Sequence, residues 1–219
     1  MLVEGLPNSG KTLTADWLGA QLPPGRLTVS HESDPDHPIA IGWPNDAAEV
    51  IRSCAASRYP FDMWEALVTS CDRVHVMEAR FCQNAACFAL LAGDDPATAV
   101  SVSTRIARIV AALNPLVVYL RVADPDAHAA SVIEKFDSVS RAYLLAAFDQ
   151  QRWLTDRGLA GETGFAAAIR AWAPIADDVM AQAANVPGVE VLVVDAPEQD
   201  WTAARMQIGR ALFPTTEHA

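Results

Sequence analysis

Short apolar runs alternate with longer stretches of helical period along this chain. The runs at Leu116–Val122 and Val189–Val194 have the length and the β-branched composition of buried strands. Shorter runs at Met1–Glu4, Arg26–Ser30 and Arg73–Met77 fit the same interpretation. Because strands that alternate with helices are typical of βαβ units, we expect an α/β fold built on five parallel strands.

Helical segments are expected between and after these strands, and breakers or capping residues mark several of their ends. Pro23–Gly25 ends the first helix, and Asp124 followed by Pro125 is a typical start for the helix after the fourth strand. The stretch from there to Asn185 is mostly helical and is interrupted at Asp156–Gly164. The other expected helices cover Lys11–Leu22, Asn45–Ser57 with Asn45 as N-cap, Pro60–Cys71, the residues up to about Leu91, Ala97–Leu113 and Trp201–Leu212.

Composition and charge exclude several classes of protein. Hydrophobic residues make up 51% of the 219 residues and charged residues 20%, which is typical of a folded chain, and we expect one domain over residues 1–219. The formal charge of −11 disfavours binding to nucleic acid. No stretch approaches the roughly 18 apolar residues that a membrane span needs, so no membrane partner is expected. Because no metal-binding spacing and no secretion signal accompany the cysteines, we expect a cytoplasmic protein with reduced thiols at Cys54, Cys71, Cys82 and Cys87.

The stretch GLPNSGKT, Gly5 to Thr12, matches the phosphate-binding pattern G-x-x-x-x-G-K-[ST] at every defined position. It stands between an expected strand and an expected helix, where backbone N–H groups and the helix N-terminus form an anion site. Lys11 adds a full charge at the β- and γ-phosphates, and the Thr12 hydroxyl is suited to bind Mg²⁺. Asn8 stands where many kinases have another glycine, and asparagine tolerates the left-handed conformation that such a loop uses. The residues expected to bind the nucleotide are Gly5, Asn8, Ser9, Gly10, Lys11, Thr12 and Leu13.

The wider stretch LVEGLPNSGKTLTADWL resembles the start of P-loop kinases of the nucleoside and nucleotide kinase group, which includes thymidylate kinases and deoxynucleoside kinases. The resemblance implies a three-layer P-loop NTPase fold, with helices on both faces of a parallel sheet in the order 2-3-1-4-5. It also implies that ATP and Mg²⁺ bind over the loop and that the phosphate acceptor binds on the side of strands 2 and 3.

Deoxynucleoside kinases carry a glutamate just after strand 2 that takes the proton from the acceptor hydroxyl. Glu32, in TVSHESD, falls at the matching place, so the resemblance implies that Glu32 is the catalytic base. A carboxylate suits this work because the base orients the hydroxyl and accepts its proton late. His31 and Asp34 are near enough to compete for the role, and a solvated acidic loop is an alternative interpretation of the whole segment.

The same kinases end strand 3 with Glu-Arg-Ser, where the acidic residue serves the metal and the arginine holds substrate or phosphate. This chain has Glu78 and Arg80 with an alanine between them, so the match is shifted by one residue. The resemblance therefore implies Glu78 as a metal ligand and Arg80 as a catalytic residue. Gln83 and Asn84 are suited to read a polar edge of the substrate or to cap a helix.

A basic lid closes over the phosphates between strands 4 and 5 in these kinases, and a helical lid is expected here around residues 125–175. The sequence does not choose among its candidate donors, Lys135, Arg141, Arg152 and Arg157. The glycines of Asp156–Gly164 suit a mobile segment. Adenine is expected against the loop Asp195–Trp201, and the tryptophans are expected mainly in the core, with stacking on the substrate left open for Trp43 and Trp64.

We therefore expect an ATP-dependent kinase whose partners are a nucleotide and a small-molecule acceptor, nucleoside-like or another hydroxylated metabolite. Few arginines, chiefly Arg52, Arg58 and Arg80, are available for a monophosphate acceptor, which favours a neutral hydroxyl. The alternative is a P-loop ATPase or nucleotide-binding regulator without a small-molecule acceptor. A GTPase is not favoured, because no N/TKxD segment follows a later strand. Assembly into a homodimer stays open.

Overall fold

The computed structural model of the chain describes residues 1–23, 25, 27–39, 61–195 and 200–213. The expected helix at residues 45–57, with its N-cap, lies outside the described residues. So do the candidate substrate residues at positions 43, 52 and 58, one of the four cysteines, and most of the expected adenine loop.

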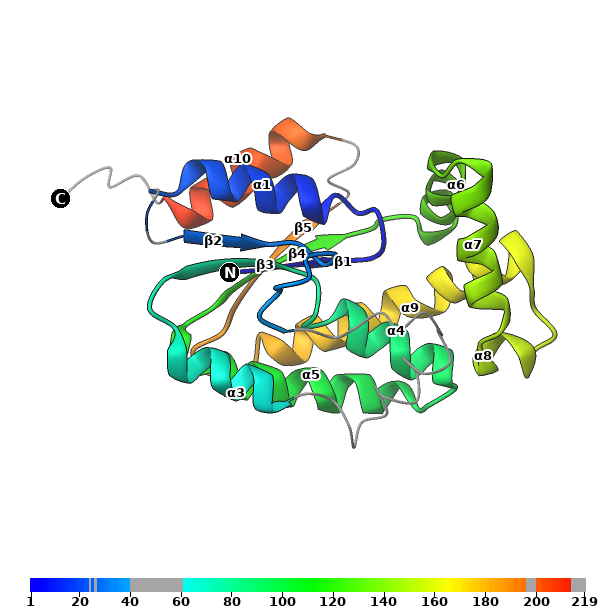
Figure 1. Cartoon of the computed structure of the whole chain (residues 1–219), viewed down its shortest axis with the longest axis horizontal. Helices are drawn as coiled ribbons and strands as arrows, with labels where there is room; N and C mark the ends of the chain where they lie inside the picture. The colour runs from blue at the N-terminus through cyan, green and yellow to red at the C-terminus, as the bar shows by residue number, and fades with distance from the viewer. Residues whose placement is uncertain (24, 26, 40–60, 196–199, 214–219) are drawn as a thin grey trace.

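Five parallel strands form one sheet in the order β2-β3-β1-β4-β5, which confirms the expected topology (Figure 1). In the central strand, Val3 is in register with Glu78 of β3 on one side and with Val118 of β4 on the other. The expected bounds hold within one or two residues. The strands are β1 (Leu2–Gly5), β2 (Leu27–Ser30), β3 (Val74–Glu78), β4 (Leu116–Arg121) and β5 (Glu190–Asp195).

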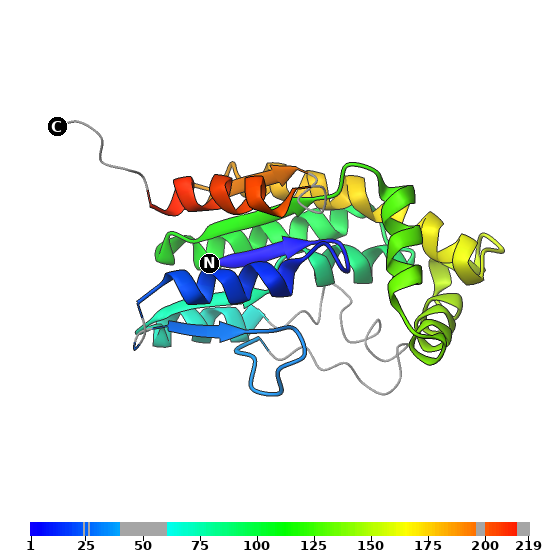
Figure 2. The ribbon, with the colours of Figure 1, turned by 90° about the horizontal axis from the view of Figure 1, so that it is seen from above.

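Helices cover both faces of the sheet, which confirms the three-layer architecture (Figures 1 and 2). One face carries α1 (Lys11–Gln21) and α10 (Trp201–Leu212). The other face carries α3 (Phe61–Ser70), α4 (Gln83–Ala92), α5 (Pro96–Val110), continued by the short turn Ala111–Leu113, and α9 (Gly161–Ala183). Beyond the carboxyl ends of the strands gather α6 (Pro125–Lys135), α7 (Ser138–Asp149) and α8 (Arg152–Thr155).

Two hydrophobic cores follow from the alternation of side chains along the strands. Leu2, Met77 and Tyr119 belong to the larger core, which lies under α4, α5 and α9. Their neighbours Val3 and Val118 belong to the smaller core under α1 and α10. The strands are therefore apolar on both faces, as buried parallel strands are.

The long helical stretch after β4 differs from the expectation in three places. One is a break at Gln150 and Gln151, between α7 and α8. The stretch breaks additionally at Asp137, whose side chain accepts hydrogen bonds from Val139 N (2.9 Å) and Ser140 N (3.0 Å) and so caps α7. The expected interruption at Asp156–Gly164 is wrong for its last four residues, because α9 already begins at Gly161. Gly164 allows α9 to pack closely against α8, since a Cβ atom there would lie 2.7 Å from Leu154 Cδ2.

None of the described helices is both long and apolar enough to cross a membrane. Within the described part of the chain, the cysteines at positions 71, 82 and 87 form no disulfide.

The turn from β1 into the phosphate loop leaves no room for a side chain at Gly5. A Cβ atom there would lie 2.4 Å from Ser9 Oγ and 2.8 Å from the carbonyl oxygen of Leu120 in the neighbouring strand. The second of these atoms belongs to the backbone of a buried strand and has little freedom to move. The first glycine of the loop is therefore required by the packing of the loop against the sheet.

We expect Gly5→Ala to lower the free energy of unfolding by about 1–3 kcal/mol, the usual cost of forcing extra volume into a packed site. Urea titration followed by circular dichroism measures it. Gly209→Ala in α10 is the matched control, since the nearest atom to its Cβ would be Trp17 Cη2 at 4.0 Å, and this change should leave stability equal or higher. Equal stabilities for Gly5→Ala and the wild type would contradict the packing argument.

Candidate functional site

The phosphate loop joins β1 to α1 at the carboxyl edge of the sheet. Asn8 has a φ angle of 58°, so it adopts the left-handed conformation expected of it. Gly10 has a φ angle of 92°, and a Cβ atom there would lie 2.0 Å from the Trp201 ring. The loop is closed by a hydrogen bond from Ser9 N to Leu6 O (3.1 Å), and α1 begins at Lys11 with its N-terminus toward the loop. This is the geometry of an anion site.

Lys11 is buried, and its Nζ donates to the carbonyl oxygen of Leu6 at 2.9 Å. Burial lowers the pKa of Lys11, while the nearby carboxylates of Glu32 and Glu78 act in the opposite direction. The ammonium group is thus held inside the loop next to two acidic side chains. Its position suits an interaction with a phosphate that replaces water at this site.

Thr12 and Glu78, the two residues expected to hold a metal ion, contact each other, since Thr12 Oγ1 donates to Glu78 Oε1 at 2.8 Å. Mg²⁺ is commonly held by one or two protein oxygens together with phosphate oxygens and water. A hydroxyl and a carboxylate side by side at the loop fit that donor set. When bound, Mg²⁺ would neutralise negative charge on the nucleotide phosphates. No group of three or more His, Cys, Asp or Glu side chains suited to a metal ion occurs among the described residues.

His31 lies on the far side of Glu78 from Thr12. Its Nδ1 is 3.0 Å from Glu78 Oε2 and its Nε2 is 3.1 Å from Asp16 Oδ1. Burial alone would lower the pKa of His31, but the hydrogen bond to Glu78 and the charges of Asp16 and Glu78 raise it above its usual value. His31 therefore holds the Glu78 carboxylate in place and is engaged on both ring nitrogens.

Glu32 is held by amide side chains from the start of α4. Gln83 Nε2 donates to both carboxylate oxygens of Glu32, at 3.1 and 2.9 Å. The Asn84 amide, oriented so that both of its atoms have partners, donates to Glu32 Oε1 (3.2 Å) and accepts from Arg80 Nη1 (2.9 Å). Arg80 Nη2 also donates to the backbone oxygen of Glu32. The candidate base is thus oriented by three side chains that follow β3.

One cavity of about 570 Å³ brings the loop and these side chains together. Its polar part includes Lys11, Thr12, Glu32 and Glu78. The remaining wall, called the aromatic wall below, is largely apolar and comes from α4, α7 and α9. It consists of Cys87, Phe88, Leu144, Phe148 and Trp172. Further lining residues are Pro7, Asn8, Gly10, Leu13, Gln83, Asn84 and Lys135.

The structure separates the residues that the sequence left as alternatives. Of His31, Glu32 and Asp34, only Glu32 is among the described residues that line the cavity. Asp34 instead accepts a hydrogen bond from the backbone of His31 (2.7 Å). Arg80, expected as a catalytic residue, is buried and does not belong to the described lining. Trp64 is fully buried in the core.

The four cations considered for the lid also differ in whether they line the cavity. Lys135 lines the cavity, whereas Arg141 lies 3.8 Å from Glu162 in an ion pair between α7 and α9. Arg152, the first residue of α8, pairs with the exposed Asp156, which directly follows this short helix, and the Arg157 guanidinium stacks over the Trp153 ring. Among these four cations, Lys135 is the one that faces the phosphate loop across the cavity.

Glu4 is a site residue that the sequence reasoning missed. It is fully buried, and its carboxylate accepts hydrogen bonds from Phe81 N (2.8 Å) and Gln83 N (3.0 Å). Between these contacts and β3 the chain passes through Ala79 and Arg80, which have φ angles of 61° and 79°. Left-handed non-glycine residues cost roughly 1–2 kcal/mol each. The Glu4 carboxylate offsets that cost and so fixes the turn that carries Arg80 and Gln83.

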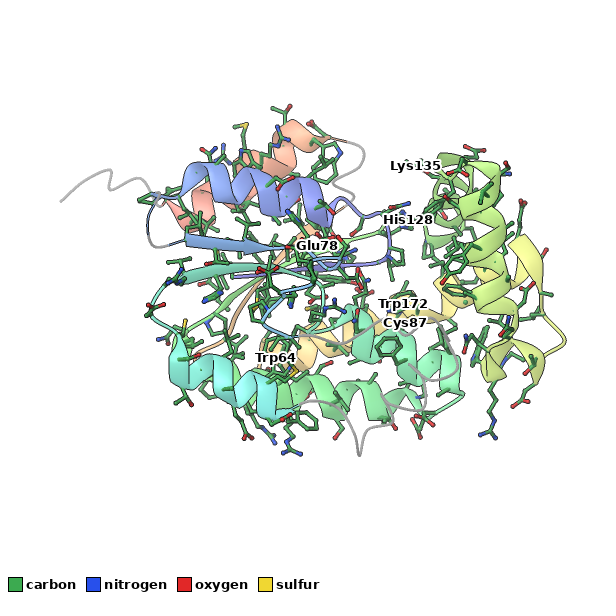
Figure 3. The ribbon with its side chains drawn as sticks, viewed as in Figure 1. Trp64, Glu78, Cys87, His128, Lys135 and Trp172 are labelled. Carbon is green, nitrogen blue, oxygen red and sulfur yellow. The ribbon has the colours of Figure 1, made fainter. Side chains whose placement is uncertain are left out.

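The aromatic wall was also missed, because its members come from helices far apart in the chain. The only local signal is helical spacing: Leu144 and Phe148 lie four residues apart on α7, as do Gln83 and Cys87 on α4. That spacing predicts a shared face but not what the face contacts. Figure 3 shows Trp172 of α9 and Cys87 of α4 in the part of the molecule that lies toward α6 and α7.

Comparisons with known proteins bear on the fold of the chain alone. No protein-family model matches the chain, and no curated protein sequence matches it. Among solved structures the chain is similar to a thymidylate kinase from Candida albicans, over 96% of this chain and 90% of that chain, with a TM-score of 0.41 and 13% identity. The assignment of a P-loop NTPase fold therefore rests on the strand order and the loop geometry.

The buried Glu4 generates a prediction about pH. Burial, the largest effect, raises the pKa of Glu4 to about 7, although the hydrogen bonds from Gln83 and Phe81 and the charge of Lys11 act against it. The folded protein therefore binds more protons than the unfolded chain between the ordinary pKa of 4.5 and about 7. As the pH rises through this window, the free energy of unfolding should fall by about 3 kcal/mol in total from this residue.

Urea unfolding of the wild type and of Glu4→Gln at several pH values between 4.5 and 8 measures the effect. The variant lacks the titrating group, so its stability should lose this part of the pH dependence. Glu190→Gln, an exposed glutamate on β5, is the control and should follow the wild type. Parallel curves for wild type and Glu4→Gln would show that Glu4 does not titrate in this window.

Proposed function

We propose that the protein is an ATP-dependent phosphotransferase that acts on a hydroxyl group of a small, uncharged molecule with an aromatic or apolar body. One observation carries the proposal: a single cavity contains the phosphate loop, a carboxylate held by amides, and an aromatic wall. A volume of about 570 Å³ is in the range of small-molecule sites.

The residues at the phosphate-loop end of the cavity support ATP as the phosphoryl donor. The loop amides and the N-terminus of α1 would surround the β-phosphate, and Lys11 would lie at the β- and γ-phosphates. Thr12 and Glu78 would hold Mg²⁺, and Lys135 would reach the transferred phosphoryl group from the lid. Positive charge aimed at the phosphoryl group stabilises the transition state, because there is little covalent work for the protein to do.

The acceptor end supports the role of Glu32. The acceptor hydroxyl attacks the γ-phosphorus, its proton passes to the Glu32 carboxylate, and the bond between the γ-phosphorus and the bridging oxygen of ADP breaks. Gln83 and Asn84 orient the carboxylate for this transfer, and Arg80 acts through the backbone of Glu32 and through Asn84. A general base that is held in place contributes about 10²–10⁴-fold to the rate.

The walls of the cavity favour an acceptor with little charge. Phe88, Phe148 and Trp172 offer aromatic surface, and Phe148 is itself held edge-on by Phe165 with ring centroids 4.9 Å apart. Two buried polar atoms of lining residues, Gln83 Oε1 and Trp172 Nε1, make no hydrogen bond to residues that the structure describes. Small movements of these side chains would let them bond to polar atoms of the acceptor.

The alternative is a P-loop ATPase or nucleotide-binding regulator, which would share Lys11, Thr12 and Glu78. Such a protein has no use for a carboxylate held in the cavity beside an aromatic wall. A thermal-shift screen in the presence of ATP separates the two, with nucleosides and hydroxylated aromatic compounds as probes and nucleoside monophosphates as charged comparators. Neutral hits that gain one phosphoryl group by mass spectrometry support the proposal. ADP formation that no compound accelerates would support the alternative.

With an acceptor from that screen, we expect Glu32→Gln to reduce the turnover number by about 10²–10⁴-fold, because the base is lost while the shape is kept. ATP affinity measured by calorimetry should stay unchanged, since the loop contacts are intact. The control is Glu65→Gln, at an exposed position on α3. Equal loss of ATP affinity, or normal turnover, would remove Glu32 from the role of base.

A further inference from the structure

The lid helix α6 is attached to the phosphate loop by a residue that the proposed chemistry does not use. Asp124 caps the helix by accepting hydrogen bonds from Asp126 N and Ala127 N, both at 3.0 Å. In the first turn, His128 is 8% exposed, and its Nε2 lies 2.7 Å from the carbonyl oxygen of Pro7 in the phosphate loop. A carbonyl oxygen only accepts, so the imidazole donates its N–H in this contact.

The helix α6 is also held by contacts other than the one with Pro7. Ala129, Val132 and Ile133 are buried in the larger core. Arg170 of α9 forms an ion pair with Asp126, with its Nε 3.0 Å from Asp126 Oδ1. Because α9 holds the helix in this way, the contact with Pro7 sets the orientation of α6 relative to the loop.

Lys135 ends the same helix, seven residues after His128. Two helical turns separate these positions, so both side chains leave α6 on one face, about 10 Å apart along its axis. Both come from α6 in Figure 3. His128 contacts Pro7, and Lys135 lines the cavity together with Pro7 and Asn8. Lys135 forms no ion pair with any residue that the structure describes.

We propose that His128 is a positioning residue that ties the lid helix to the phosphate loop and thereby places Lys135 over the transferred phosphoryl group. The inference rests on the proposed function for the role of Lys135. Through His128, a change in the phosphate loop moves the lid cation, and the lid orientation in turn acts on the loop. Lys135 would contact the γ-phosphate, and His128 would act only by setting the position of Lys135.

The test compares the affinities for a non-hydrolysable ATP analogue and for ADP, both measured by calorimetry. Lys135→Met should lose about tenfold or more of the preference for the triphosphate, as expected for one charge-assisted contact. His128→Leu, which keeps the bulk and loses the N–H, should lose a similar factor. His128→Gln, whose amide can donate to Pro7 O, should restore most of the preference. Arg152→Met on α8 is the control and should leave it unchanged.

The double variant decides between positioning and general support of the fold. If His128 acts through Lys135, then His128→Leu combined with Lys135→Met should be no weaker for the triphosphate than Lys135→Met alone. Losses that add in full, or a His128→Leu protein with wild-type preference, would overturn the proposal. Should His128→Leu fail to fold, His128→Asn replaces it, because its shorter amide does not span the distance to Pro7 O.

Failure of the proposed function would give a different result. An ATPase without a small-molecule acceptor would show no phosphorylated product, yet the preference for triphosphate over ADP would still depend on His128 and Lys135. A working kinase in which the His128 variants bind both nucleotides as the wild type does would keep the function and remove the positioning role.

Discussion

The arrangement of the candidate site depends on the buried carboxylate of Glu4. It stands one residue before the phosphate loop and accepts the backbone N–H groups of Phe81 and Gln83 from the segment after β3. In this way the central strand holds a left-handed turn at Ala79 and Arg80 that would otherwise be strained. Glu4 therefore connects the strand that leads into the phosphate loop with the segment after β3, and the cost is a carboxylate buried near Lys11.

From that turn a chain of contacts leads to the candidate base. The segment after β3 carries Arg80 and then the first residues of α4, and Gln83 and Asn84 orient the Glu32 carboxylate. On the other side of the loop, Glu78 joins Thr12 to His31. Glu32 and Glu78, which lie at the carboxyl ends of the neighbouring strands β2 and β3, thus line different parts of the same cavity. Parallel strands bring this about because their carboxyl ends share one edge of the sheet.

The helices α6 and α7 complete the cavity, and their side chains are cationic or apolar, in contrast to the carboxylates at the edge of the sheet. α6 and α7 contribute one cation and two apolar side chains, so the phosphate end and the body of an acceptor would be enclosed by the same pair of helices. His128 makes the lid continuous with the loop, while α9 supports α6 from behind through Arg170 and the larger core. The phosphate loop, the base and the lid are in this sense one connected structure.

The sequence by itself determined the features that depend on local geometry. The spacing of Gly5, Gly10 and Lys11 and the tolerance of Asn8 for a left-handed φ predict the loop, and strand-sized apolar runs predict the sheet, because steric limits and side-chain periods act over a few residues. The strand order came from the resemblance of the first 17 or so residues to P-loop kinases, and the pairing of the strands confirms it. Only the tertiary structure decided that Glu4 holds the turn after β3, that Glu32 lines the cavity while His31 and Asp34 do not, and that Lys135 faces the loop while the other lid cations are paired elsewhere. These outcomes depend on the packing of helices and turns that are distant in the chain, where burial and available partners select one of several chemically equal side chains.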